Sequence, residues 1–263
     1  VENFPGFPEG IMGPDLMDNM RQQAEKFGAR VVFDDVLSVD LSSDVKTLRL
    51  YDKEIQARSV IIATGSAYRH LNVPGEDKLS GRGVSYCATC DGFFFRGKDL
   101  VVVGGGDSAM EEALFLTRFA SKVTVVHRRD QLRASQVMAQ RALDNPKIEF
   151  AWDSTVQEVL GEESVTGVLL KNLKTDALTE LPAAGVFVAI GHDPRSALFA
   201  DQVKLDDAGY IKVDEPSTKT SLPGVFACGD VVDQTYRQAI TAAGTGCRAA
   251  LDSGHYLEEM KHS

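Results

Sequence analysis

The sequence predicts an α/β fold built from two related Rossmann-like dinucleotide-binding domains. The first observation is a strand–glycine–helix–strand pattern over residues 98–130, which is typical of a βαβ unit. The second is a repeat: Ala-x-Gly-x-x-x-Arg occurs at 63–69 and again at 189–195, each time within an apolar strand that follows shorter alternating strands. The third is length, because 263 residues can form two ordinary domains, although one large domain is also compatible with that length.

The βαβ pattern reads "DLVVVGGGDSAMEEALFLTRFASKVTVVHRRD". Its helix is amphipathic, so we expect one side of it to face the sheet. The side chains expected on that side are Leu114, Phe115, Phe119 and Ala120. A second helix is expected over about 131–143, followed by short strands and then a buried strand over 185–195.

The front of the chain repeats the end of this order. A helix is expected over about 15–27, alternating strands over 31–57, and the apolar strand of the repeat over 59–69. In the second copy Gly104 lies 87 residues before Gly191, and the same spacing before Gly65 falls at position −22. The repeat therefore predicts that the phosphate loop of the first domain lies upstream, and that this chain is a fragment.

Composition excludes several classes of protein. The net charge is −10, from 28 Lys and Arg against 38 Asp and Glu, which argues against nucleic-acid partners and anionic membranes. No apolar run approaches the ~20 residues of a membrane span. Four cysteines in 263 residues do not make a secreted disulfide scaffold, so we expect the reducing cytoplasm.

A glycine fingerprint opens the helix of the βαβ unit. Gly104 permits the tight turn, Gly106 lets the backbone approach a diphosphate, and Ala109 allows close helix packing. The helix N-terminus that follows the glycines favours the anion. A glycine-rich turn without a ligand is the alternative, but the complete βαβ setting favours a nucleotide.

The end of the second strand indicates which nucleotide. An NAD site places an acid about 20 residues after the glycines, whereas this chain has His127, Arg128 and Arg129, with Arg133 beyond them. Guanidinium groups suit a 2′-phosphate. The pattern favours NADP over the alternative of a solvated basic turn.

Two of the cysteines, Cys87 and Cys90, form a C-x-x-C pair. Zinc needs four ligands, and no second such pair and no H-x-x-x-H pair exists, so no metal is expected. Buried unreactive thiols remain an alternative, but a redox pair is favoured, with Asp91 placed to move protons. Cys228 and Cys247 stand alone among apolar or small residues and are expected to be packing residues.

The segment "SLPGVFACGDVVDQTYRQAITAAGTG" places an apolar strand before Gly229 and Asp230. An acid at a strand end can accept a hydrogen bond from a polyol. The next helix opens at 237–239, where its amides and an arginine can face an electron-accepting ring or a phosphate. Simple helix capping explains the same residues equally well.

Together these motifs resemble the low-molecular-weight, bacterial-type thioredoxin reductases over nearly the whole chain. "CATCDG", followed by "VVGGGDSAMEEA" and "HRRDQLRAS", is the most specific part of the resemblance, and "VENFPGF", "IIATGS", "IGHDP", "GVFACGDVVD" and "YRQAITAAGTGC" extend it. The resemblance implies a homodimeric flavoprotein that moves electrons from NADPH through FAD to a cysteine pair and on to thioredoxin. It also implies FAD/NAD(P)-binding domains of the three-layer ββα kind, one inserted in the other. The FAD domain would comprise 1–68 and 198–263, without its first βαβ unit, and the NADPH domain 69–197.

The resemblance assigns roles to individual residues. Cys90 would lie nearer the flavin, Cys87 would attack thioredoxin, and Asp91 would be the acid. The residues implied as NADPH contacts are Ser108, His127, Arg128, Arg129, Arg133, Ile190 and Tyr210. Those implied as FAD contacts are Asn3, Val36, Thr64, Gly65, Asp230, Arg237, Gln238 and Ala239.

The chief departure from the family is the absent first glycine fingerprint. We therefore expect a protein of residues 1–263 to bind NADPH but to be nearly colourless and to reduce no thioredoxin. Two alternatives stay open: another flavin dithiol-disulfide reductase of the same architecture, and a non-enzymatic NADPH-binding fragment that lacks FAD. Hinges near 67–71 and 193–197 would let the disulfide alternate between flavin and partner.

Overall fold

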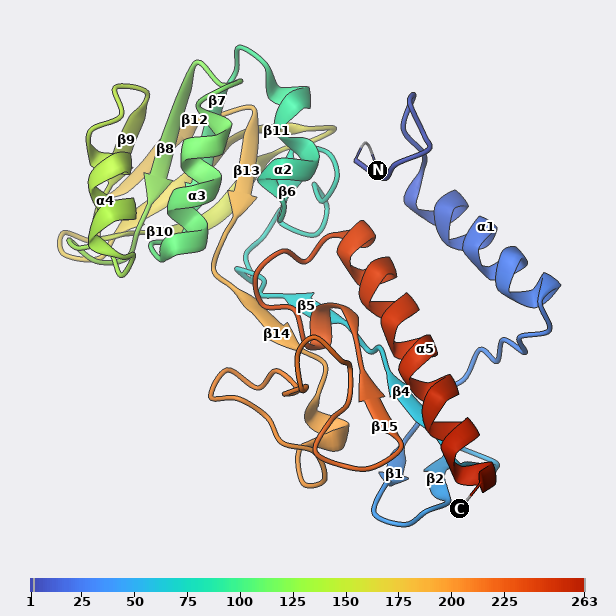
Figure 1. Cartoon of the computed structure of the whole chain (residues 1–263). Coiled ribbons are helices and arrows are strands. Elements are labelled where there is room, and N and C mark those ends of the chain that lie inside the picture. The colour runs from blue at the N-terminus through green and yellow to red at the C-terminus, as the bar shows by residue number, and fades with distance from the viewer. Residues whose placement is uncertain (2, 263) are drawn as a thin grey trace. The chain divides into compact units, whose positions relative to one another are not determined.

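The computed structural model describes residues 1 and 3–262, and the chain divides into two compact units. The inserted unit is Tyr68–His192, and the terminal unit combines Val1–Ala67 with Asp193–Ser263. Figure 1 shows the chain coloured from its N-terminus to its C-terminus. In the described part of the chain, no helix combines the length and apolar character that crossing a bilayer requires.

The inserted unit is built on a five-stranded parallel sheet (Figure 1). Its strands, in spatial order, are β6 (Val84–Ser85), β13 (Gly185–Val188), β7 (Asp99–Val103), β8 (Lys122–Val126) and β9 (Ile148–Ala151). The expected βαβ unit is confirmed, because α3 (Asp107–Leu116) connects β7 to β8.

Side chains of the parallel strands alternate between two hydrophobic cores. On β7, Leu100 and Val102 belong to the core under the helices, while Val101 and Val103 belong to the core on the opposite face. This is the period of two that a strand imposes on its side chains. Both faces of the sheet are therefore covered, as a parallel sheet requires.

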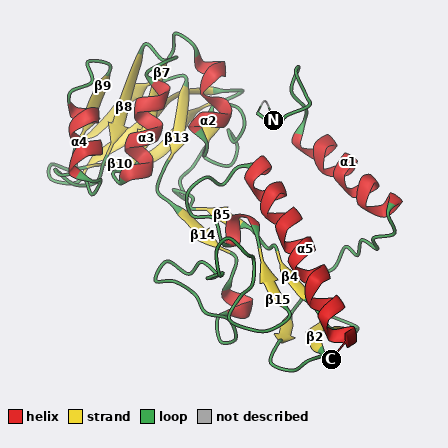
Figure 2. Cartoon of the chain, viewed as in Figure 1, coloured by secondary structure: helices red, strands yellow, loops and turns green. Residues whose placement is uncertain are grey.

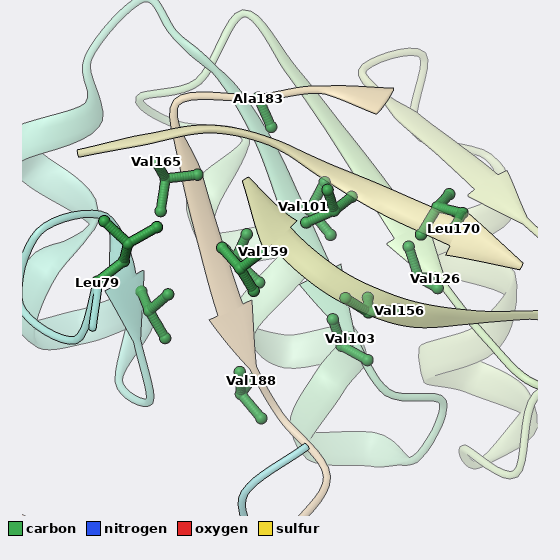
Figure 3. Packing of buried hydrophobic residues seen from close by; sticks show 13 residues of the cluster. Leu79, Val101, Val103, Val126, Val156, Val159, Val165, Leu170, Ala183 and Val188 are labelled. Carbon is green, nitrogen blue, oxygen red and sulfur yellow. The ribbon is translucent and has the colours of Figure 1, made fainter. Parts of the chain in front are cut away.

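The second face of the parallel sheet is covered by a three-stranded antiparallel sheet. Its strands are β10 (Ser154–Gly161), β11 (Val165–Asn172) and β12 (Leu178–Pro182). Figure 3 shows Val101, Val159 and Leu170 meeting in the core between the two sheets. Helices, parallel sheet and antiparallel sheet make the three ββα layers that were predicted, so the fold class is confirmed.

Three helices lie on the other face (Figure 2): α2 (Ala88–Asp91), α3 and α4 (Gln136–Leu143). A 3-10 turn, η1 (Gly92–Phe95), continues α2. The predicted apolar side of α3 is confirmed in part, because Ala120 is buried and Leu114 and Phe115 pack against the core under the helices. Its fully buried residues are Ala109, Met110, Ala113 and Leu116. Leu114 and Phe115 are only half-buried, and Phe119 lies beyond the helix end, because small side chains let the helix approach the sheet closely.

The helix expected from about residue 131 begins five residues later, at Gln136. The backbone N–H groups of Arg133 and Ala134 donate instead to the carbonyl of Gly105, at 2.7 and 3.1 Å. Ser135 donates its N–H and its hydroxyl to Asp107. These residues hold the glycine loop in place, so the helix cannot include them.

The terminal unit begins with α1 (Gly13–Lys26), close to the predicted helix, of which only Leu16 is buried. A small antiparallel sheet follows, with strands β1 (Ser38–Asp40), β2 (Lys46–Arg49) and β3 (Glu54–Ala57). The strand expected from residue 31 is wrong at its start, because 29–37 have no regular structure and are mostly exposed.

A two-stranded parallel sheet forms the centre of the terminal unit, from β4 (Val60–Ile62) and β15 (Val225–Ala227). On β15, Val225 and Ala227 join one core, and Phe226 joins a second core against the long helix α5 (Ala239–His262). Two 3-10 turns, η2 (Ala197–Phe199) and η3 (Gly229–Val231), complete the unit.

The chain passes between the two units twice, and the two connecting segments form strands that hydrogen-bond to each other. β5 (Ser66–Tyr68) and β14 (His192–Pro194) form a two-stranded sheet. The single strand predicted over 185–195 is therefore two strands, β13 and β14. They are separated at 189–191, where Gly191 has a positive φ of 105°.

Candidate active site

Cys87 and Cys90 form a disulfide in the inserted unit. Cys87 is the N-cap of α2, and Cys90 lies within that helix, with 5.3 Å between the two Cα atoms. The pairing of these residues is thus confirmed. Among the described residues, no cluster of three or more His, Cys, Asp or Glu is arranged to hold a metal ion.

A buried serine, Ser85, joins the disulfide to Asp91. The Ser85 hydroxyl donates to Asp91 Oδ2 at 2.6 Å and accepts the N–H of Cys87 at 3.1 Å. The carboxylate is therefore fixed beside the helix that carries both cysteines. Sequence reasoning missed Ser85, although its place two residues before Cys87, at the end of a strand, was a signal that it faces the same helix.

Two exposed aromatic rings follow the disulfide. Phe93 and Phe94 are 61% and 63% exposed, and the Arg96 guanidinium lies over the Phe93 ring, 5.0 Å from its centroid. Phe95 instead packs edge-on against the buried Phe187. The redox pair is thus followed directly by an apolar, cation-flanked surface.

A pocket of about 730 Å³ lies at the carboxyl ends of the parallel strands of the same unit. This is where open parallel sheets bind nucleotides. Of the predicted NADPH contacts, those that line it are Gly104, Gly106, Ser108, Ala109, His127, Arg128, Arg133 and Ile190. Arg129 is exposed and is not a lining residue, and Tyr210 is buried in the terminal unit.

Each position of the glycine loop requires glycine for a different physical reason. Gly104 has a φ of 155°, and a Cβ there would overlap the Ala189 carbonyl and the Cβ of Ala109. A Cβ on Gly105 would overlap the His127 ring. A Cβ on Gly106 would meet nothing within 4 Å. Gly106 therefore faces open space, as a position where the backbone approaches a ligand requires.

His127 is buried, unlike the neighbouring arginines. Its Nε2–H donates to the Gln131 carbonyl at 3.0 Å. Burial lowers the pKa of His127, and Arg133, Arg128 and Arg129 lower it further, against the opposing effect of the Gln131 hydrogen bond. The ring is therefore neutral near pH 7, and the positive charge of the pocket comes from arginines.

In the terminal unit, the predicted FAD contacts gather at the carboxyl ends of β4 and β15. Thr64 and Gly65 follow β4, and Gly229 and Asp230 follow β15. The two strand ends are joined because the N–H of Cys228 donates to the Ile62 carbonyl at 3.0 Å. Burial raises the pKa of Asp230, and so does Asp233, while Arg237 opposes them.

A second group of predicted FAD contacts lies before α5. Asn3 donates from its side chain to Gln238 Oε1 at 2.9 Å, and Ala239 is the first residue of the helix. Asp233, which sequence reasoning missed, accepts the N–H groups of Thr235, Tyr236 and Arg237. Burial acts to raise the Asp233 pKa, but these hydrogen bonds and that of Thr241 lower it overall.

These residues fit part of a dinucleotide: two parallel strand ends, an acid that can accept from a polyol, and a helix N-terminus that suits phosphate. Val36 is half-buried in the irregular stretch 29–37.

One of the two free cysteines of this unit differs from expectation. Cys228 is buried, and burial raises its thiol pKa. Cys247 is exposed, so the packing role expected for it is wrong.

Comparisons with known proteins agree with this geometry. The profile of the pyridine nucleotide-disulphide oxidoreductase family matches residues 4–246. The chain is 62% identical over 264 residues to a thioredoxin reductase of Streptomyces clavuligerus, covering 100% of this chain and 82% of that protein. It is 59% identical over 260 residues to one from Mycolicibacterium smegmatis, covering 99% and 84%. The crystal structure of thioredoxin reductase from Streptococcus pyogenes MGAS5005 matches with a TM-score of 0.91 at 47% identity, over 98% of this chain and 84% of that one.

Proposed function

The chain belongs to the pyridine nucleotide-disulphide oxidoreductase family, and we propose that it works as an NADPH-dependent thioredoxin reductase. NADPH and FAD are its cofactors, and electrons pass through Cys87–Cys90 to thioredoxin. The observation that carries the proposal is the disulfide at the start of α2, within the same unit as the nucleotide pocket.

NADPH binds the inserted unit in this proposal. The diphosphate lies against the glycine loop and the N-terminus of α3, and Arg128 and Arg133 take the 2′-phosphate. His127 is neutral and bound to Gln131, so it shapes the loop by packing on Gly105 and adds no charge. Arg129 supplies longer-range positive potential from the surface.

The terminal unit would hold FAD, with Asp230 to accept from a hydroxyl of the cofactor and the segment from Arg237 to Ala239 to contact its ring or phosphate. The order that Asp233 imposes on residues 235–237 prepares this segment. When bound, FAD supplies the two-electron link between the nicotinamide hydride and the disulfide.

The cysteines carry the exchange. The Cys87–Cys90 disulfide takes up two electrons and two protons and becomes two thiols. The Cys87 thiolate attacks one sulfur of the thioredoxin disulfide, and the other sulfur leaves and is protonated. The Cys90 thiolate then attacks Cys87 Sγ, which restores the Cys87–Cys90 bond and releases the second thioredoxin thiolate to be protonated.

Asp91 relays the protons of these steps. Its carboxylate is held by the Ser85 hydroxyl at 2.6 Å, and its backbone N–H donates to the Cys87 carbonyl at 3.1 Å. Ser85 thus keeps the acid in one orientation while the sulfurs change partners. A fixed donor beside the reacting group is what general acid–base catalysis needs.

Exposed apolar side chains are the basis for the proposed thioredoxin-binding and dimer surfaces. Phe93 and Phe94, beside Arg96, offer thioredoxin an aromatic docking surface next to the disulfide. The exposed apolar side chains of the terminal unit, Met12, Met17 and Phe27 among them, are the surface we assign to a homodimer. The cytoplasm is the proposed location, because a thiol-based cycle works in a reducing compartment.

The test is steady-state NADPH oxidation by the FAD-loaded form of the protein, with two disulfide substrates compared. Thioredoxin should support turnover, and the disulfide of a peroxidase-system partner protein should support at most a small fraction of it. Equal turnover with both would favour a broader flavin dithiol reductase, and turnover with neither would contradict the proposal. The relatives named thioredoxin reductase at 59–62% identity favour the first outcome.

A further inference from the structure

We propose that Arg69 binds the phosphate on the nicotinamide half of NADPH, and that the buried Glu76 holds the segment of Arg69 against the nucleotide pocket. The inference rests on the NADPH site proposed above. It adds one more wall to the nucleotide pocket, formed by residues 69–71 at the start of the inserted unit. Neither the glycine fingerprint nor the arginines after β8 include these residues.

Arg69, His70 and Leu71 line the same pocket as the glycine loop. The Arg69 backbone N–H donates to the Gly191 carbonyl at 3.1 Å. The side chain of Arg69 runs beside the same glycine, because a Cβ on Gly191 would meet Arg69 Nη1 at 3.5 Å. Gly191 follows the lining residue Ile190, so Arg69 extends the pocket edge formed after β13.

The sheet order assigns this edge to one half of the ligand. β13 lies on one side of β7, and β8 lies on the other. Arg128 and Arg133, which suit the adenosine 2′-phosphate, follow β8. Arg69 follows β5 in the chain but is hydrogen-bonded to Gly191, which comes after β13. A dinucleotide that crosses the glycine loop after β7 therefore reaches Arg69 with its nicotinamide half.

Charge selects which group of that half Arg69 contacts. The dihydronicotinamide ring of NADPH is uncharged, so it offers a guanidinium no opposite charge. The phosphate of the same half is an anion, and arginine binds phosphate through charged hydrogen bonds. Arg69 thus complements the diphosphate from the side that the amides of the glycine loop leave open.

Glu76 makes this wall rigid. It is 1% exposed, and a buried carboxylate must be satisfied by donors. The N–H of Leu71 donates to Glu76 Oε1 at 2.9 Å, the N–H of Asn72 donates to Oε2 at 2.7 Å, and the Tyr86 hydroxyl donates to Oε1 at 3.1 Å. These bonds secure the backbone directly after Arg69, including Asn72 with its positive φ of 58°.

The test compares three ligands by calorimetric titration of the 263-residue protein: NADPH, NADH and adenosine 2′,5′-bisphosphate, which lacks the nicotinamide half. Arg69 is exposed, so Arg69→Ala leaves folding intact. It should weaken NADPH and NADH equally, by about tenfold or more for one lost charged hydrogen bond, and leave the bisphosphate unchanged. Arg69→Lys, which keeps the charge, should recover most of the loss.

Arg128→Ala is the matched control, and it should weaken NADPH and the bisphosphate but not NADH. Glu76→Gln replaces one acceptor oxygen by a donor, so it should act like a smaller Arg69→Ala and speed hydrogen exchange at the amides of Leu71 and Asn72. Tyr86→Phe removes one donor to Glu76 but keeps both backbone bonds, so it should change NADPH affinity and exchange at these amides less than Glu76→Gln does.

Unchanged NADPH affinity in Arg69→Ala, together with a loss in Arg128→Ala, would overturn this inference and leave the proposed function standing. A loss of bisphosphate affinity in Arg69→Ala would also overturn it, by moving the contact to the adenosine half. No binding of NADPH to the unchanged protein would overturn both proposals.

Discussion

The inserted and terminal units place their binding residues in different ways. In the inserted unit, the five-residue strands β7 and β8 bury valines on both faces, and the pocket residues all fall within 69–191. In the terminal unit, the parallel sheet has two strands of three residues. There, apolar side chains such as Met12, Phe27 and Phe33 are 69%, 81% and 87% exposed.

This difference shows that the nucleotide pocket depends on local sequence, whereas the proposed FAD site depends on residues far apart in the chain. The nucleotide pocket follows from one βαβ unit and the strand beside it. The proposed FAD contacts come from both ends of the chain, and Asn3 meets Gln238 across a separation of 235 residues. We expect the inserted unit to be the more stable of the two and the terminal site to be the more sensitive to distant change.

The largest expected effect separates the cysteines of the two units. Cys87→Ser and Cys90→Ser should each abolish thioredoxin reduction, because both sulfurs are needed to complete exchange, whereas Cys247→Ser should keep most of it, because its thiol is exposed and unpaired. NADPH-dependent thioredoxin reduction is the measurement.

A second result distinguishes the two active cysteines. Cys90→Ser should accumulate a mixed disulfide between Cys87 and thioredoxin, visible by mass spectrometry of the non-reduced protein. A mixed disulfide found only in Cys87→Ser would reverse the proposed order of attack.

Core truncation should distinguish the units by stability. Leu100 is 1% exposed beneath the helices of the inserted unit, and Leu100→Ala should lower the free energy of unfolding by about 2–5 kcal/mol. Leu251, which is 59% exposed on α5, should cost at most about 0.5 kcal/mol when changed to Ala. Urea unfolding followed by circular dichroism measures both, and similar losses would contradict the difference in packing.

The arginines after β8 should separate NADPH from NADH. Arg128→Ala should weaken NADPH binding by about 1.5–3 kcal/mol, one charged hydrogen bond, with little change for NADH. Arg129 does not line the pocket, so Arg129→Ala should have a smaller effect on NADPH. Fluorescence titration with both nucleotides checks this, and equal losses for NADPH and NADH would remove the 2′-phosphate assignment.

The smallest expected effect is a pH dependence of stability at the proposed FAD site. The pKa of Asp230 is raised, first by burial, so its contribution to stability is present below the ordinary carboxyl pKa and is lost as pH rises through the raised value. Asp230→Asn should therefore give a modest gain in unfolding free energy near pH 7 and no gain at low pH.

Asp233→Asn is the control of opposite sign. The pKa of Asp233 is lowered by backbone hydrogen bonds that outweigh burial, so its contribution is present above the ordinary pKa and is lost as pH falls through the lowered value. Asp233→Asn should lose stability near pH 7. Thermal melts from pH 3 to pH 8 measure both variants, and shifts of the same sign at neutral pH would contradict the assignments.

Much of the inserted unit was predictable because its signals are local. The period-two strands, the glycine loop and Cys87–Cys90 follow from short-range sequence, and each is found in the structure. The face of α3 was predicted only in part, because Leu114, Phe115 and Ala120 pack in or against the core but the fully buried residues of the helix were not named. Ala109 and Ala113 are two of the four fully buried residues, since the loop at Gly104 draws the helix close to the sheet.

Hydrogen bonds between residues of different structural elements could not be predicted from the sequence. Ser85 bonds to Asp91, and Asp107 bonds to Ser135, 28 residues away, which keeps the residues before Gln136 out of α4. Such pairs depend on the final positions of several elements. The exposure of Cys247 was missed for a related reason, because small neighbours on a helix do not reveal which face is covered.

The most direct test of the central claim is the stoichiometry of electron flow. With FAD supplied and oxygen excluded, each NADPH consumed should produce two thioredoxin thiols, counted by alkylation and mass spectrometry, and Cys87→Ser should produce none while still binding NADPH. Thioredoxin thiols formed at the same rate by Cys87→Ser would contradict the passage of electrons through the Cys87–Cys90 pair.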